Sequence, residues 1–139
     1  MCGGKYVKLI IGGFAQGKLH YVLQKYGFEN CVVLDADILD ELYDKKENSK
    51  SEKIIVINHL HQWVRQCLID RKNPEQLVQD FLEKNLDCII ISDEIGNGIV
   101  PIDAFEREYR ERTGRILIKL AENAQEVERV ICGIGQKIK

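Results

Sequence analysis

Five short apolar runs divide the chain, and most of them are continuous rather than alternating with polar residues. Each is rich in β-branched side chains and bounded by glycine or polar residues, although two charged residues interrupt the last one. Such runs are typical of strands that are buried on both faces, as in a parallel sheet. The pattern therefore predicts strands at Tyr6–Ile11, Cys31–Leu34, Ile54–Ile57, Cys88–Ile91 and Val127–Cys132.

Between the runs, apolar residues recur with the spacing of one helix face. Asn73 and Pro74 form a typical cap and first turn for one helix, and Asp103 with Glu106 resembles a capping box that opens a longer one. Helices that alternate with strands predict right-handed βαβ units and a three-layer α/β sandwich with a mostly parallel sheet. The apolar stripes are Leu60, Trp63, Val64, Cys67 and Leu68; Leu77, Val78, Phe81 and Leu82; and Phe105, Tyr109, Ile116 and Leu120.

The composition is that of a globular protein. The 139 residues are 45% hydrophobic and 30% charged, and this length predicts a single domain over residues 1–139. The formal net charge of −2 gives no electrostatic reason to expect nucleic acid or an anionic membrane as a partner. The apolar runs are far shorter than the ~18–20 residues of a membrane span, and the first residues lack the pattern of a secretory signal. We therefore expect a cytoplasmic protein.

Cysteine usage predicts the same compartment. The five cysteines are an odd number without a C-x-x-C or a zinc-type spacing, which is typical of a reduced protein without structural disulfides. Cys31, Cys88 and Cys132 lie in apolar runs, where a thiol behaves as a small buried hydrophobe. Cys67 shares a helical stripe, and Cys2 is expected to be exposed.

The clearest chemical motif directly follows the first predicted strand. Residues 12–18 read G-G-F-A-Q-G-K and match the phosphate-binding pattern G-x-x-x-x-G-K. Between a strand and a helix, the backbone N–H groups of such a loop wrap phosphates, while Lys18 and the helix N-terminus supply positive charge. Leu19 stands where the pattern has a hydroxyl that binds Mg²⁺, and the alternative is a glycine-rich turn without a ligand. The predicted nucleotide-binding residues of the motif are Gly12, Gly13, Phe14, Ala15, Gln16, Gly17, Lys18 and Leu19.

Polar residues at the ends of other predicted strands are candidates for a second part of the site. A P-loop enzyme needs an acid near the metal, and the carboxyl ends of parallel strands meet at one edge of the sheet. Asn58 takes this place after the third run, and we include it with Asp35 among the nucleotide-binding candidates. Each carboxylate has the alternative role of a hydrated loop residue. The carboxylates expected near this edge are Asp35, Asp37, Asp93 and Glu94.

The segment after the fourth run carries a family resemblance. Residues 92–101 read S-D-E-I-G-N-G-I-V-P, in which two glycines and a proline before a capped helix imply a fixed backbone path. From Asp93 to Lys139 the chain resembles the C-terminal part of the adenosylcobinamide kinase/adenosylcobinamide-phosphate guanylyltransferase family of cobalamin biosynthesis. Residues 12–18 and 58–63 resemble two further motifs of this family. The C-terminal matches are Glu94, Gly96, Gly98, Ile99, Val100, Pro101, Arg107, Arg110, Gly114, Arg115, Gly133 and Ile134.

This resemblance implies a RecA-like P-loop fold and two activities. The family phosphorylates the hydroxyl of the aminopropanol arm of adenosylcobinamide with a nucleoside triphosphate. It then transfers GMP from GTP onto that phosphate through a guanylylated histidine. The resemblance thus implies GTP or ATP as the nucleotide, Mg²⁺ as its companion, a cobinamide as the corrinoid substrate, and a homo-oligomer, specifically a trimer. Lys18 and Glu94 are the catalytic residues that it suggests.

Departures from the family pattern argue against part of this chemistry. Family members are longer between the second and third strands, where they carry the nucleophilic histidine. Residues 38–53 stand there in this chain and contain no histidine, so guanylyl transfer by the family route is not expected. The polar stretch 44–53 within them is predicted to be a solvated loop. Leu19 and Asn58 both weaken the case for Mg²⁺, and no metal site is predicted.

The sequence leaves the roles of the three histidines open. His20 follows the phosphate loop, whereas His59 and His61 follow the third strand, where either is a substitute nucleophile or only a hydrogen-bonding loop residue. Two residues apart on a helix they point in different directions, which argues against a metal pair. The leading hypothesis is a divergent family member with residual kinase activity. The alternatives are a nucleotide-binding regulatory or assembly protein without catalysis, and a small P-loop kinase for another substrate.

Overall fold

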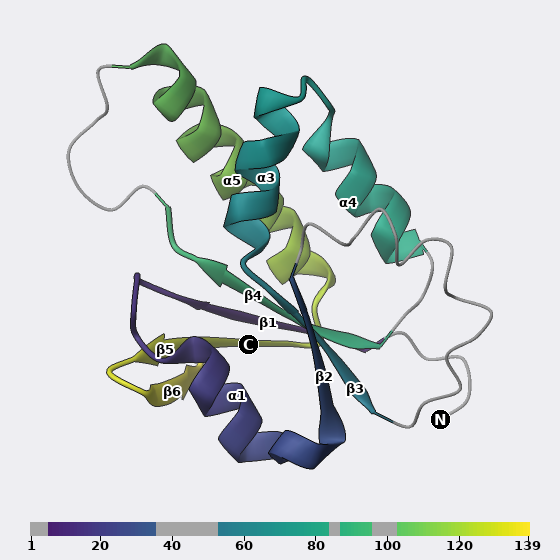
Figure 1. Cartoon of the computed structure of the whole chain (residues 1–139), viewed down its shortest axis with the longest axis vertical. Helices are drawn as coiled ribbons and strands as arrows, with labels where there is room; N and C mark the ends of the chain where they lie inside the picture. Colours follow the sequence, from purple (N-terminus) through teal and green to yellow (C-terminus); the bar gives the residue numbers. More distant parts are fainter. Residues whose placement is uncertain (1–5, 36–52, 84–86, 96–102) are drawn as a thin grey trace.

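The computed structural model describes residues 6–35, 53–83, 87–95 and 103–139. The described strands form one sheet in the order β2-β3-β4-β1-β5-β6 (Figure 1). The first five strands pair in parallel, and β6 pairs antiparallel with β5. The strands are β1 (Val7–Gly12), β2 (Cys31–Asp35), β3 (Ile54–Asn58), β4 (Cys88–Asp93), β5 (Glu126–Ile131) and β6 (Ile134–Lys137).

Helices cover both faces of this sheet, which confirms the predicted three-layer α/β sandwich with a mostly parallel sheet. One helix, α1, lies on one face, and α3, α4 and α5 lie on the other (Figure 1). Two buried apolar clusters result, because alternate residues of each strand point to opposite faces. Val22 of α1 packs with Ile10 of β1, whereas Trp63 and Phe81 belong to the larger cluster on the other face. The helices are α1 (Lys18–Tyr26), α3 (Leu60–Ile69), α4 (Pro74–Glu83) and α5 (Ala104–Asn123).

The predicted helix caps are present, with one difference. Asn73 caps α4 by accepting a backbone N–H of its first turn at 3.2 Å. Asp103 caps α5, since its Oδ1 accepts the N–H of Phe105 at 2.8 Å. Glu106 does not complete a capping box: its carboxylate accepts two hydrogen bonds from Arg65, at 3.0 and 2.5 Å. The side chain that the pattern assigns to a local cap therefore ties α5 to α3.

The two edges of the sheet differ from the predicted pattern. β2 is an edge strand, and Val33 is 40% exposed, so this apolar run is not buried on both faces. At the other edge, Cys132 and Gly133 have φ values of 50° and 76° and form the turn that leads into β6. This last strand was not predicted, because its sequence I-G-Q-K has neither an apolar run nor an alternating pattern.

The four cysteines that the structure describes form no disulfide, and not all of them are buried. Cys67 and Cys88 are buried as predicted, and Cys31 is half-buried at the edge strand. Cys132 is exposed, which corrects the prediction. The fifth strand ends one residue earlier than the apolar run suggested, and the turn carries this thiol into solvent.

Several predictions lie outside the described residues. They concern Cys2, Asp37, the stretch 38–52 and the motif residues 96–101. Among the described helices, none is long and apolar enough to cross a membrane.

A fully buried lysine lies inside the first strand, where the sequence pattern predicts only apolar packing. Lys8 is 0% exposed and faces α1, where its Nζ lies 2.9 Å from Glu128 Oε1 and 2.7 Å from Tyr26 Oη. Glu128 also accepts hydrogen bonds from Lys25 at 2.8 Å and from Tyr21 Oη at 2.6 Å. These contacts join α1 to β1 and β5 through a network in which each buried charge has partners.

The network makes stability depend on pH. Burial alone would raise the pKa of Glu128, but hydrogen bonds from Lys25, Tyr21 and Lys8 outweigh it and lower the pKa to about 2. A lowered folded-state pKa stabilises the protein above the ordinary value near 4.5, and this stabilisation is lost as the pH falls toward 2. We expect Glu128→Gln to lower the free energy of unfolding by about 3 kcal/mol at pH 7 and by progressively less below pH 4.5.

Urea unfolding between pH 7 and pH 2.5 measures this difference. Glu122, which is exposed in α5, provides the matched control, and Glu122→Gln should follow the wild-type pH profile. A difference between the wild type and Glu128→Gln that stays constant down to pH 2.5 would contradict the assignment.

Candidate nucleotide-binding site

A cavity of about 360 Å³ opens at the carboxyl edge of β1, β3 and β4, next to the start of α1. It brings together predicted residues from two distant segments, the loop before α1 and the end of β3. It also collects residues that were not among the predicted nucleotide-binding set, from α1, β4 and the start of α3. The lining residues are Phe14, Ala15, Gln16, Gly17, Lys18, Leu19, His20, Asn58, His59, His61, Gln62, Ile91 and Asp93.

The backbone of the loop has the form of an anion-binding nest. Ala15 and Gly17 have positive φ values of 55° and 82°, an alternation that turns successive N–H groups toward one point. No side chain caps the start of α1, and its first turn carries no acidic residue. At Gly12 a Cβ would lie 2.6 Å from the carbonyl oxygen of Val130, so only glycine fits at this position of β1. The loop therefore offers free N–H groups and a positive helix end to the cavity.

The turn between β5 and β6 supports this loop. The side-chain Oε1 of Gln16 accepts the N–H of Cys132, and its backbone carbonyl accepts the N–H of Gly133, both at 2.8 Å. A Cβ on Gly17 would lie 3.6 Å from the Cα of Gly133. Because these residues are more than a hundred positions apart, the sequence pattern could not assign this role to Gln16.

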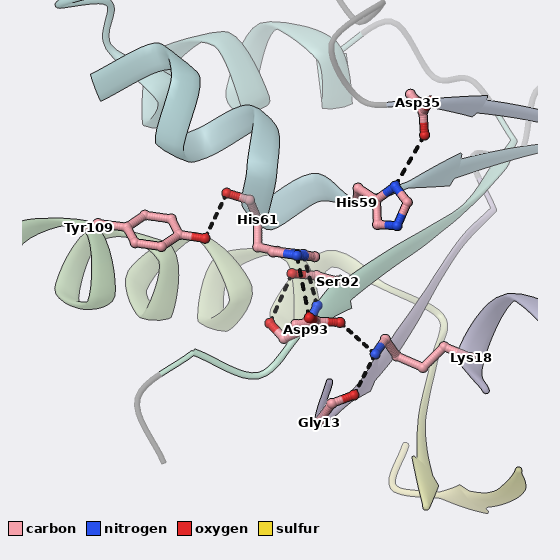
Figure 2. Close-up of polar contacts among 8 residues, drawn as sticks. All are labelled: Gly13, Lys18, Asp35, His59, His61, Ser92, Asp93 and Tyr109. Carbon is pink, nitrogen blue, oxygen red and sulfur yellow. Dashed lines mark hydrogen bonds and ion pairs between the residues drawn. The ribbon is translucent and has the colours of Figure 1, made fainter. Parts of the chain in front are cut away.

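Lys18 is held between two oxygens at the inner wall of the cavity (Figure 2). Its Nζ lies 2.5 Å from Asp93 Oδ1 and donates to the carbonyl of Gly13 at 2.7 Å. The lysine is 8% exposed. Asp93, one of the strand-end carboxylates, thus occupies the partner position that a phosphate oxygen takes in a phosphate loop. A bound anion has to displace or share this contact.

His61 is fixed by the same aspartate. Its Nδ1 accepts the backbone N–H of Asp93 at 3.1 Å, and its Nε2 lies 3.4 Å from Asp93 Oδ2. Tyr109 of α5 donates its hydroxyl to the carbonyl of His61 at 3.0 Å. Burial lowers the pKa of His61, despite the nearby charge of Asp93. An amide can only donate, so the neutral ring carries its proton on Nε2, facing the carboxylate.

His59 has a different arrangement at the rim of the cavity. Asp35 lies opposite Asn58 in the β2–β3 ladder, and its Oδ1 lies 3.1 Å from Nδ1 of His59 (Figure 2). The histidine is the N-cap of α3, with φ at 60° and no side-chain cap hydrogen bond. Asp35 thus contacts the site through His59, although it is not itself a lining residue.

Glu94, a predicted catalytic residue, is not among the residues that line the cavity. Its carboxylate accepts two hydrogen bonds from Arg129 of β5, at 2.7 and 3.0 Å, and its backbone N–H donates to Gly12 at 2.8 Å. Glu94 therefore directly follows the end of β4 and links it to β1 and β5.

The described residues at the cavity supply few side-chain oxygen ligands for Mg²⁺. Among them, no group of three or more His, Cys, Asp or Glu residues is placed to hold a metal ion. Leu19 offers no oxygen, Asn58 offers only an amide, and the carboxylate of Asp93 is paired with Lys18. Mg²⁺ prefers several oxygen ligands and is often held by one or two carboxylates together with substrate phosphates.

The fold and site together define a P-loop α/β protein, with a phosphate-type loop between the central strand β1 and α1. The chain belongs to the family of cobinamide kinase / cobinamide phosphate guanyltransferase, which it matches over residues 30–138. This match confirms the resemblance that the sequence motifs predict. The phosphate loop lies before the matched residues, so its assignment depends on its own sequence and geometry.

Two curated relatives are similar to parts of this chain. It is 43% identical over 82 residues to the bifunctional adenosylcobalamin biosynthesis protein CobU of Escherichia coli K12, which is 56% of this chain and 44% of that protein. It is 43% identical over 51 residues to the protein of the same name from Salmonella typhimurium LT2, which is 37% of this chain and 28% of that protein. The matched parts therefore span less than half of each relative.

Proposed function

We propose that this protein binds GTP or ATP in the cavity and transfers the terminal phosphate to the hydroxyl of a cobinamide. The observation that carries this proposal is the position of Lys18. This residue is the first of α1, and both its side chain and the uncapped start of the helix lie at the cavity wall. Both supply positive charge where a triphosphate would lie. Family membership supports a cobinamide as the acceptor.

The second family activity is not part of the proposal. Guanylyl transfer requires a nucleophilic histidine, and residues 38–53 contain none. Mg²⁺ would arrive with the triphosphate and be held mainly by its phosphates, because the cavity supplies few oxygen ligands of its own. A cytoplasmic location, a single domain and a homotrimer belong to the same proposal. The odd number of cysteines without a zinc-type spacing supports the location, the single sheet supports one domain, and the family resemblance supports the trimer.

A nucleotide-binding protein without catalysis is the second candidate function. The contact between Lys18 and Asp93, together with Leu19 and Asn58 at the metal positions, favours it. Such a protein would bind a nucleotide as a regulatory or assembly partner and transfer nothing. A small kinase for another acceptor differs from the proposal only in the substrate.

Calorimetric titration with GTP and ATP, with and without Mg²⁺, tests nucleotide binding. We expect binding whose affinity changes less than about tenfold on Mg²⁺ removal, about 1.4 kcal/mol. Incubation with γ-labelled nucleotide and cobinamide should label the corrinoid, whereas α-labelled GTP should leave the protein unlabelled. Binding without transfer would favour the non-catalytic function, and no binding of either nucleotide would exclude both.

A further inference from the structure

The two histidines at the cavity differ in which ring nitrogen is available. A carboxylate can only accept, so its contact with Asp35 places the proton of neutral His59 on Nδ1 and leaves a lone pair on Nε2. His61 has no such nitrogen, since Nδ1 accepts the Asp93 amide and Nε2 faces the Asp93 carboxylate. His61 is buried, whereas the His59 side chain is 46% exposed. Of the two, His59 alone presents a basic nitrogen.

The backbone at His59 is also unusual. Its φ of 60° lies in the left-handed region that β-carbon-bearing residues rarely adopt. Its side chain makes no cap hydrogen bond to α3 that would offset the cost of this positive φ. Asparagine or glycine would suit an N-cap position with a positive φ better. Backbone strain that no local hydrogen bond offsets is often found at functional positions.

From these observations we infer that His59 is the general base of the proposed kinase and that Asp35 is its positioning residue. The inference rests on the proposed phosphate transfer. Nε2 of His59 takes the proton of the acceptor hydroxyl as that oxygen forms its bond to the γ-phosphorus. The bond from the γ-phosphorus to the bridging oxygen breaks, and the nucleoside diphosphate leaves with the electron pair. Asp35 stabilises the imidazolium that forms, which later releases its proton to water.

His59→Gly is the most informative variant. Glycine accepts the positive φ without strain and leaves a space that free imidazole can enter. We expect transfer to cobinamide to fall by about 10²–10⁴-fold, with the nucleotide affinity and the thermal midpoint at or above wild type. Added imidazole should raise the transfer rate of this variant by at least about tenfold. Asp35→Asn should also slow transfer, because its amide can donate to Nδ1 and shift the ring proton to Nε2.

His61→Asn is the matched control. It removes a histidine from the same cavity whose ring nitrogens both face Asp93. Because His61 is not the base, imidazole should not restore any activity that this variant loses. Acylation by diethyl pyrocarbonate gives a readout independent of turnover: His59 should be modified, bound nucleotide should protect it, and His61 should stay unmodified in the folded protein.

The outcomes separate the two proposals. An active wild type whose His59→Gly variant keeps its rate, or loses it without imidazole rescue, would overturn the role of His59 and leave the kinase function standing. A phosphorylated histidine adduct would also overturn the role of a base. A wild type that binds nucleotide but transfers no phosphate would overturn both.

Discussion

Replacing Lys18 with alanine is expected to weaken nucleotide binding by at least about 100-fold. The variant loses the one cation that reaches the inner wall of the cavity among the described lining residues. It also leaves the carboxylate of Asp93 without its 2.5 Å partner, so a negative charge faces the triphosphate directly. Both effects act against an anionic ligand. Calorimetric titration with GTP and ATP measures the loss, and circular dichroism checks that the fold is kept.

Neutralising Asp93, the partner of Lys18, should strengthen nucleotide binding instead of weakening it. Asp93→Asn removes the carboxylate that competes with phosphate for Lys18 while keeping the backbone N–H that donates to His61. We expect nucleotide affinity to rise severalfold, within about 1 kcal/mol. Should Asp93→Asn weaken binding as strongly as Lys18→Ala, the aspartate would be serving the ligand rather than competing with it.

Lys8→Met is expected to destabilise the fold about as much as Glu128→Gln does at pH 7. Removing one partner of a buried charge network costs about 3–5 kcal/mol, because the remaining groups stay desolvated. Glu128 keeps Lys25 and Tyr21, so we expect the lower end of this range, about 3 kcal/mol. Tyr26 also loses the ammonium that donates to its hydroxyl. Urea unfolding at pH 7 measures the change in the free energy of unfolding.

Lys25→Met is the control for this prediction. Lys25 contacts the same carboxylate as Lys8, at 2.8 Å, but its side chain is 42% exposed. Water therefore screens its charge, and the loss should stay near 0–1 kcal/mol. Equal effects of the two substitutions would show that burial does not set the strength of this network.

Local patterns predicted most of the framework. Four apolar runs match strands β1 to β4 to within one or two residues at each end, because continuous β-branched runs are characteristic of a parallel sheet. The Asn73 and Asp103 caps act within one turn of a helix, which makes them visible in sequence. β6 gave no such signal, since an exposed four-residue edge strand needs no apolar pattern of its own.

The chemical roles of individual side chains were less visible. The sequence grouped Glu94 with the catalytic candidates but gave no sign of its contact with Arg129 of β5. It treated Lys8 as part of an apolar run, although the side chain ends in a buried ion network under α1. His59 and His61 looked alike in sequence, two residues apart after the same strand. Their different partners, Asp35 and Asp93, separate their chemistry.

Short stretches of sequence were enough to predict the α/β class, the phosphate-loop motif and the family, because each is encoded by residues close together in the chain. The contacts between distant groups follow from the fold: Lys18 with Asp93, Gln16 with the turn at Cys132, and His59 with Asp35. Such contacts depend on strand order and register, which bring distant residues to one edge of the sheet. Hydrogen-bond partners then fix where each proton and charge lies, and no local periodicity records that choice.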